Sequence, residues 1–156
     1  MLKAKDIMTS PVTTLTPGQE IMDAARILLE RHINGAPVLD EDGMIVGVLT
    51  RDDLITQQKE IPLPSYFVVL DALIPIKSLG QVEREAEKIA ATTVEHAMTA
   101  DPVIVSPDTP IGEIAELMVD KKVHTIPVQD ESGELVGVIG KEDVLKTMVP
   151  GQKAKS

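Results

Sequence analysis

Residues 33–53 read INGAPVLDEDGMIVGVLTRDD, and residues 123–143 read VHTIPVQDESGELVGVIGKED. In each stretch a short apolar run is followed by an acidic segment containing Gly, and then by a second apolar run. Two apolar runs joined by Asp-Gly or Ser-Gly predict a β-hairpin. The acidic residues that close each stretch predict the first turn of a helix. We therefore expect one folding unit to occur twice in this chain.

The repeat extends beyond the hairpins at a constant offset. Met8-Thr9 recurs as Met98-Thr99, an offset of 98 − 8 = 90 residues, and no gap is needed between residues 8–55 and 98–145. Before each hairpin, an extended stretch leads to a hydroxyl residue and Pro, at Thr16-Pro17 and Ser106-Pro107. This pair predicts the N-cap and first residue of a helix. Each unit therefore reads β-α-β-β-α, which predicts an α/β (α+β) fold.

The predicted units are small and must support each other. A unit of roughly 50 residues cannot bury a sufficient core alone, so we expect two pseudo-symmetric units packed through their sheets. We place unit 1 at residues 1–60 and unit 2 at residues 94–150. Residues 61–93 have no counterpart at the offset and are predicted to be a helical insert or linker, and residues 151–156 a flexible tail.

Charge and composition exclude several classes of protein. The chain of 156 residues has 43% apolar residues and a net charge of −10, a field that repels nucleic acid and anionic membrane surfaces. It has no Cys, which excludes disulfides and thiolate zinc sites. No apolar run approaches the roughly 20 residues of a membrane span. We expect a cytoplasmic protein without a membrane or nucleic-acid partner.

The segment that follows the first hairpin carries the most chemical information. Thr50 lies at the end of a predicted strand, and Asp53 follows three residues later. One interpretation is a capping box, in which both side chains satisfy free backbone N–H groups. The other is a ligand site, in which the helix N-terminus faces a phosphate and Asp53 accepts the hydroxyls of a ribose. The residues alone leave both interpretations open.

These motifs together resemble a known family. Both halves combine Met-Thr, an apolar-x-x-apolar-Pro-Val stretch, Asp-x-x-Gly and a final Thr-x-x-Asp or Gly-x-x-Asp. This pattern, found twice in register, resembles a pair of cystathionine β-synthase (CBS) domains, and the insert resembles that of small stand-alone bacterial CBS-pair proteins. The resemblance implies two units with clefts between them, regulatory binding of adenosyl ligands, and homodimers.

The resemblance implies a main ligand site between the two units. Its motifs place the first Thr-x-x-Asp opposite the early strand and the apolar-x-x-apolar-Pro stretch of unit 2. His124 falls at a position where some family members contact phosphate. The implied residues of this main site are Thr50, Arg51, Asp53, Val103, Val123, His124, Thr125 and Pro127.

The related second site is expected to be weaker or empty. Asp143 is kept there, but Gly140 replaces the hydroxyl residue and Asn34 stands where the first site has His124. Lys141 could supply charge to a phosphate. The implied residues of this weaker site are Val12, Thr13, Asn34, Gly35, Ala36, Pro37, Lys141 and Asp143.

Two functions follow from the resemblance. The first is a regulatory module that binds AMP, ADP, ATP or a related adenosyl ligand, with Mg²⁺ only as a companion of a polyphosphate, and reports to an unidentified protein partner. The alternative is a dimerisation or docking module with degenerate sites. We expect no catalytic residues and no metal site, because no catalytic motif is visible and the three His residues are scattered.

Overall fold

The computed structural model describes residues 1–60 and 92–149. The predicted helical insert, apart from its last residues, and the predicted tail lie outside this range. The first half contains α2 (Ile21–Glu30), β1 (Gly35–Leu39), β2 (Ile45–Thr50) and α3 (Arg51–Glu60). The second half repeats this order with α7 (Ile111–Asp120), β4 (Thr125–Gln129), β5 (Leu135–Gly140) and α8 (Lys141–Lys146). The α/β fold class and the tandem repeat are confirmed.

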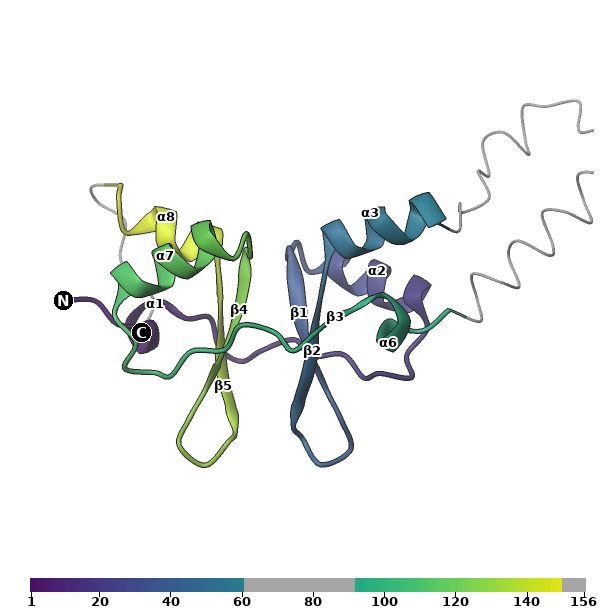
Figure 1. Cartoon of the computed structure of the whole chain (residues 1–156), viewed down its shortest axis with the longest axis horizontal. Coiled ribbons are helices and arrows are strands. Elements are labelled where there is room, and N and C mark those ends of the chain that lie inside the picture. The colour runs from purple at the N-terminus through teal and green to yellow at the C-terminus, as the bar shows by residue number, and fades with distance from the viewer. Residues whose placement is uncertain (61–91, 150–156) are drawn as a thin grey trace, which may run out of the picture.

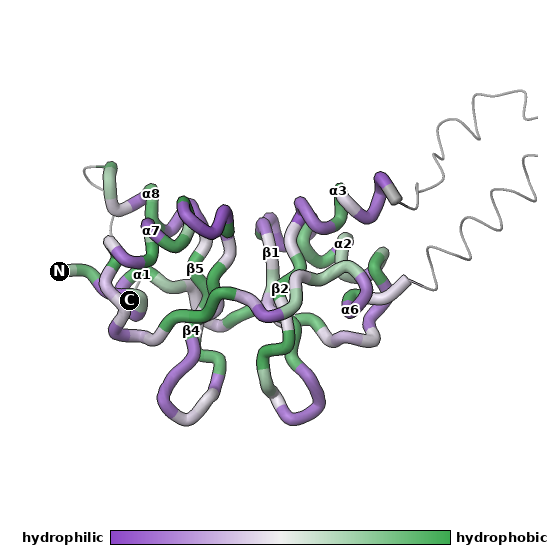
Figure 2. The backbone as a smooth tube through the Cα atoms, viewed as in Figure 1, coloured by the Kyte–Doolittle hydropathy of each residue, from purple (hydrophilic) through white to green (hydrophobic). Residues whose placement is uncertain are grey.

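Each repeat is built on an antiparallel hairpin. β1 pairs with β2 and β4 pairs with β5, with Pro37 opposite Val48 and Pro127 opposite Val138. At the turns, Gly43 and Gly133 have φ angles of 81° and 88°, a conformation that glycine adopts without strain. The predicted hairpins are therefore confirmed. Their turns are hydrophilic and point away from the helices, which lie at the opposite end of the strands (Figures 1 and 2).

The two repeats exchange their first segments. The short helix α1 (Ala4–Ile7) packs in the core of the second hairpin, where Ala4 and Ile7 are buried with Ile114 and Ile126. The matching helix α6 (Val94–Ala97) packs in the core of the first hairpin, where Val94 is buried among Leu15, Leu28, Leu49 and others. Two connections therefore cross between the units (Figure 1).

The exchanged segments also extend the sheets. Strand β3 (Thr99–Ala100) pairs with β2, and Thr9 makes an isolated bridge to Val138 of β5. The approach is close because Gly47 lies against Met98, and Gly137 against Met8. A Cβ atom on Gly47 would lie 2.5 Å from the Met98 Sδ and 2.8 Å from the Thr99 carbonyl oxygen. Because glycine has no side chain, Gly47 and Gly137 allow each Met-Thr pair to pack against the hairpin of the opposite repeat.

The first helix of each repeat begins later than expected. Helices α2 and α7 start at Ile21 and Ile111, whereas Thr16-Pro17 and Ser106-Pro107 lie in turns. The prediction was wrong because the exchanged segments supply partners for the intervening backbone. The Glu95 N–H donates to the Pro17 carbonyl at 2.9 Å, and the Lys5 N–H donates to the Pro107 carbonyl at 2.9 Å.

The units face each other through their sheets, with β1 in contact with β4 and β5. Helices α2, α3, α7 and α8 lie on one side of the molecule (Figure 1). In the described part of the chain, no helix has the length and apolarity that crossing a membrane requires.

Replacing Gly47 by Ala should destabilise the protein by roughly 1–3 kcal/mol, because its methyl group would overlap Met98 and the Thr99 carbonyl. The control is Gly112→Ala in α7, where no atom lies within 4 Å of the added Cβ. That change should be neutral or slightly stabilising. Urea unfolding compares the two variants, and equal stabilities would contradict the docking role of Gly47.

The turn of the second hairpin contains a titratable group with a lowered pKa. The hydroxyl of Ser132 donates to Asp130 Oδ1 at 2.6 Å, and with the Glu134 N–H it lowers the pKa of Asp130 below its ordinary value. The carboxylate form is therefore favoured by folding, a contribution that is present above the ordinary pKa and lost as the pH falls through the lowered one. Ser132→Ala should raise this pKa toward its ordinary value, as measured by NMR titration of the side-chain carboxyl. An unchanged value would show that the hydroxyl is not its main cause.

Candidate functional site

A pocket of about 310 Å³ opens between the two units and is called here the Asp53 pocket. One wall comes from unit 1 and from the exchanged segment, with Thr50, Asp53 and Thr99. The facing wall comes from the second repeat, with Val103, Val123 and His124. The pocket is also lined by Asn34, Val48, Asp52, Asp101, Pro102, Lys121, Lys122 and Thr125. It thus combines an apolar surface with carboxylates and cations.

Thr50 and Asp53 form a reciprocal pair at the N-terminus of α3. The Thr50 N–H donates to Asp53 Oδ2 at 3.0 Å, and the Asp53 N–H donates to the Thr50 hydroxyl at 3.1 Å. The capping-box interpretation is therefore confirmed. The bond from the Thr50 N–H leaves acceptor positions of the Asp53 carboxylate free, because an ionised carboxylate has about four. The same pair can cap the helix and accept ligand hydroxyls.

A second pocket of about 580 Å³ lies around Asp143 and is called here the Asp143 pocket. Many of its lining residues lie at positions equivalent to those of the Asp53 pocket, with Gly140 in place of Thr50 and Asn34 in place of His124. Asp143 Oδ2 accepts the Gly140 N–H at 2.8 Å. Its lining is Thr9, Arg31, His32, Ile33, Asn34, Gly35, Arg51, Thr125, Val138, Gly140, Lys141, Glu142, Asp143 and Lys146.

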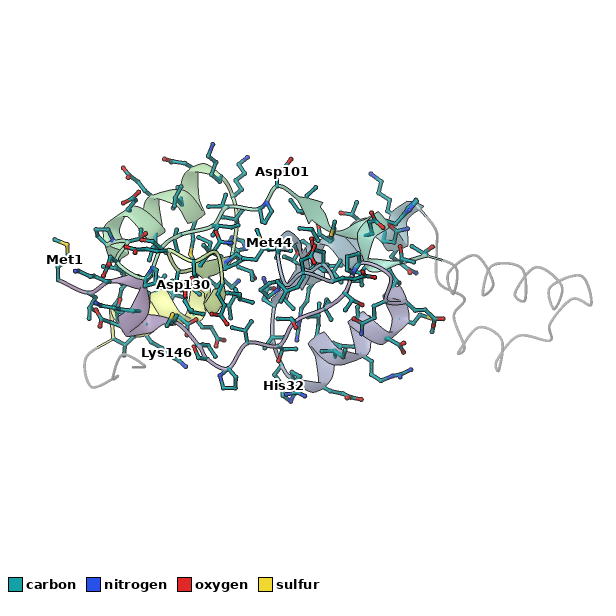
Figure 3. The ribbon with its side chains drawn as sticks, turned by 90° about the horizontal axis from the view of Figure 1, so that it is seen from below. Met1, His32, Met44, Asp101, Asp130 and Lys146 are labelled. Carbon is teal, nitrogen blue, oxygen red and sulfur yellow. The ribbon has the colours of Figure 1, made fainter. Side chains whose placement is uncertain are left out.

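The two pockets open on opposite edges of the contact between the units. In the view from below, Asp101 of the Asp53 pocket lies at one edge, and His32 and Lys146 of the Asp143 pocket lie at the other (Figure 3). Asn34 and Thr125 line both pockets. The pockets therefore share a wall at the pseudo-twofold axis.

The structure corrects the placement of Arg51. This residue was expected beside Thr50 and Asp53, but it lines the Asp143 pocket. Its Nε donates to the Ile33 carbonyl at 3.0 Å, and its Nη2 lies 3.4 Å from the Leu28 carbonyl. Leu28 lies in the last turn of α2 and Ile33 in the connection between α2 and β1, so these carbonyls hold the guanidinium away from the Asp53 pocket.

Five further residues that were expected at the ligand sites line neither the Asp53 pocket nor the Asp143 pocket. Ala36, Pro37 and Pro127 are fully buried in strands. The Pro37 and Pro127 carbonyls accept the N–H groups of Leu15 and Val105. Val12 lines a separate cavity of about 600 Å³ between the hairpin turns, and Thr13 is absent from the walls of the Asp143 pocket.

Sequence reasoning missed two hydroxyl residues that the exchange brings to the pockets. The Thr99 hydroxyl donates to Asp53 Oδ1 at 3.1 Å. Its counterpart Thr9 lies 3.4 and 3.5 Å from the two oxygens of Asp143. The repeated Met-Thr pair was the available signal, but only the exchange shows which carboxylate each Thr meets.

The family follows from comparison with known proteins. A model of the CBS domain matches residues 4–60 and 94–150. The chain belongs to the CBS domain family. It is a tandem CBS pair.

Individual CBS proteins match most of the chain. An uncharacterized protein of Methanocaldococcus jannaschii, MJ1426, is 28% identical over 154 residues, covering 93% of this chain and 90% of that protein. The CBS domain of a membrane protein from Sphaerobacter thermophilus superposes with a TM-score of 0.72 at 32% identity, covering 95% and 88%. The CBS pair of MJ0100, solved with 5′-methylthioadenosine and S-adenosyl-L-methionine, gives a TM-score of 0.69 at 26% identity, covering 94% and 95%. In two further relatives, both named as enzymes, the match spans 22% of the relative.

The bond between Thr99 and Asp53 can be measured without a ligand. A double-mutant cycle with Thr99→Val and Asp53→Ala should give a coupling free energy of about 0.5–1.5 kcal/mol, the usual contribution of a hydrogen bond. The matched cycle with Thr9→Val and Asp143→Ala should give a smaller value, because its distances are 3.4 and 3.5 Å. Urea unfolding measures both cycles. Equal couplings would contradict the difference in geometry.

Proposed function

We propose that this CBS pair is a regulatory module that binds adenine nucleotides or related adenosyl ligands between its two units. The observation that carries the proposal is the Thr50–Asp53 pair at the N-terminus of α3, facing Val123 and His124 across the Asp53 pocket. At about 310 Å³, that pocket is at the lower end of the usual range for small-molecule sites.

The lining of the Asp53 pocket suits each part of an adenosyl ligand. The carboxylate of Asp53 would accept the ribose hydroxyls, for which it keeps acceptor positions beyond its bonds to Thr50 and Thr99. The apolar side chains of Val48, Val103 and Val123 would cover the adenine ring. Lys121, Lys122 and His124 offer donors for a phosphate or another polar group.

The relatives support this ligand class. The MJ0100 CBS pair, 26% identical over nearly the whole chain, was solved with two adenosyl compounds. Its ligands carry no phosphate, so the shared chemistry is the adenosine itself. We assign recognition of that group to Asp53 and Asp143 in this protein.

The proposed role is binding and reporting rather than catalysis. A ligand between the units contacts both, so it would favour one relative orientation of the two. In the described residues there is no group of three or more His, Asp or Glu side chains able to hold a metal ion. In this proposal Mg²⁺ enters only with a bound polyphosphate.

We also propose that the protein acts as a homodimer. Large apolar side chains are exposed on helices α2, α3, α7 and α8: Leu29 on α2 is 62% exposed, Ile55 on α3 68%, Val119 on α7 74% and Leu145 on α8 53%. A second copy would remove these side chains from water. The alternative function, a dimerisation or docking module without a ligand, rests on this same observation.

Asp53→Asn is the variant that tests ligand binding, because an amide oxygen can still cap α3 while the negative acceptor is lost. Calorimetric titration of the full chain with AMP and with 5′-methylthioadenosine should show affinity lowered roughly 10- to 100-fold in the variant, as expected for lost hydrogen bonds to a charged group. Asp143→Asn is the matched control for the other pocket.

A wild-type protein that binds no adenosyl compound would overturn the proposed function. If light scattering then shows a stable dimer that Val119→Asp dissociates, the assembly role takes its place. If the wild type binds and Asp53→Asn binds equally well, the ligand lies outside the Asp53 pocket.

A further inference from the structure

The two pockets differ in charge, because they differ both in some residues at equivalent positions and in which positions line them. The Asp143 pocket has two carboxylates, Glu142 and Asp143, and four cations, which are Arg31, Arg51, Lys141 and Lys146. The Asp53 pocket has three carboxylates, Asp52, Asp53 and Asp101, and the two cations Lys121 and Lys122. One pocket therefore has an excess of positive charge, and the other an excess of negative charge.

The cations of the Asp143 pocket are available to a ligand. Within residues 1–60 and 92–149, none of the four forms an ion pair with a carboxylate. Arg51 is held by the Ile33 and Leu28 carbonyls, which fix its guanidinium without neutralising it. Arg51 and Lys146 are half-buried, so their charges are less screened than those of fully exposed side chains.

The Asp143 pocket is also the larger one, at about 580 Å³ against about 310 Å³. One of its positions is a glycine, Gly140, where the Asp53 pocket has Thr50. A Cβ on Gly140 would meet its nearest atoms at 3.8 and 3.9 Å, which is ordinary contact. The glycine therefore leaves open space beside Asp143 that a side chain could occupy without strain.

A nucleoside polyphosphate needs both the positive charge and the larger volume of the Asp143 pocket. Its phosphate chain carries several negative charges and takes more room than a single phosphate. In a chain with a net charge of −10, the global field opposes such a ligand, so only a local excess of cations can hold it.

We propose that the Asp143 pocket is the site for a nucleoside polyphosphate of the ADP or ATP class, whereas the Asp53 pocket takes adenosyl ligands with at most one phosphate. This assignment rests on the proposed function and specifies it. It reverses, for polyphosphates, the order expected from the sequence, in which the second site was the weaker. The missing hydroxyl at Gly140 and the missing His at Asn34 are offset by Arg31, Arg51, Lys141 and Lys146.

The test uses the full chain and two matched charge variants. The first combines Lys141→Gln with Lys146→Thr, since Thr56 is the residue equivalent to Lys146 in the first repeat. The second combines Lys121→Gln with Lys122→Gln in the Asp53 pocket. Thermal unfolding confirms that each variant is folded. Calorimetry then measures ATP and 5′-methylthioadenosine, the latter a probe without phosphate.

The proposal predicts that the first variant loses ATP affinity about tenfold or more and binds 5′-methylthioadenosine within about twofold of the wild type. The second variant should keep ATP affinity within about twofold. Raising KCl from about 50 mM to about 500 mM should weaken ATP binding far more than 5′-methylthioadenosine binding. Gly140→Thr, which fills the open space, should also weaken ATP selectively.

Three results would overturn the assignment. If ATP binding is unchanged in the Lys141/Lys146 variant, or is lost in Asp53→Asn while Asp143→Asn retains it, the polyphosphate lies in the other pocket and the proposed function still stands. If no adenosyl compound binds the wild type, the assignment fails together with the proposed function.

Discussion

The docking of each Met-Thr pair on the opposite repeat is the contact on which the rest of the structure depends. Gly47 and Gly137 leave room for Met98 and Met8, and the following Thr residues pair with Val48 and Val138. Each core is completed by residues that precede the other repeat in the sequence. Neither repeat is therefore a separate folding unit, and the pocket between them is a consequence of their joint folding.

The exchanged segments also link the sheets to the carboxylates of the two pockets. Thr99 extends the first sheet through its backbone while its hydroxyl bonds Asp53. Thr9 takes the equivalent place beside Asp143 at longer distances. A backbone that is fixed by sheet pairing holds a carboxylate in position better than a free loop would. The same residues thus stabilise the fold and orient the two acceptors.

The strands were predictable because their signal is local. Apolar runs on both sides of Asp-Gly or Ser-Gly predict the two hairpins, and both stretches form them, as β1–β2 and β4–β5. The starts of α2 and α7 were not predictable from a local signal, because the backbone before them, at Pro17 and Pro107, accepts hydrogen bonds from Glu95 and Lys5, which are far away in the sequence. Arg51 was misplaced for a similar reason, since the carbonyls that orient it lie at the end of α2 and in the connection that follows it.

The shared wall of the pockets limits how independent they can be. Asn34 and Thr125 line both, and a Cβ atom on Gly35 would lie 2.7 Å from the Thr125 hydroxyl, so this wall is already packed tightly. A ligand that displaces either side chain in one pocket changes the surface of the other. If the proposed ligands do so, the affinities of the two pockets would be coupled, and the coupling would act equally in both directions. For that reason, a substitution in one pocket has meaning only when binding to both is measured.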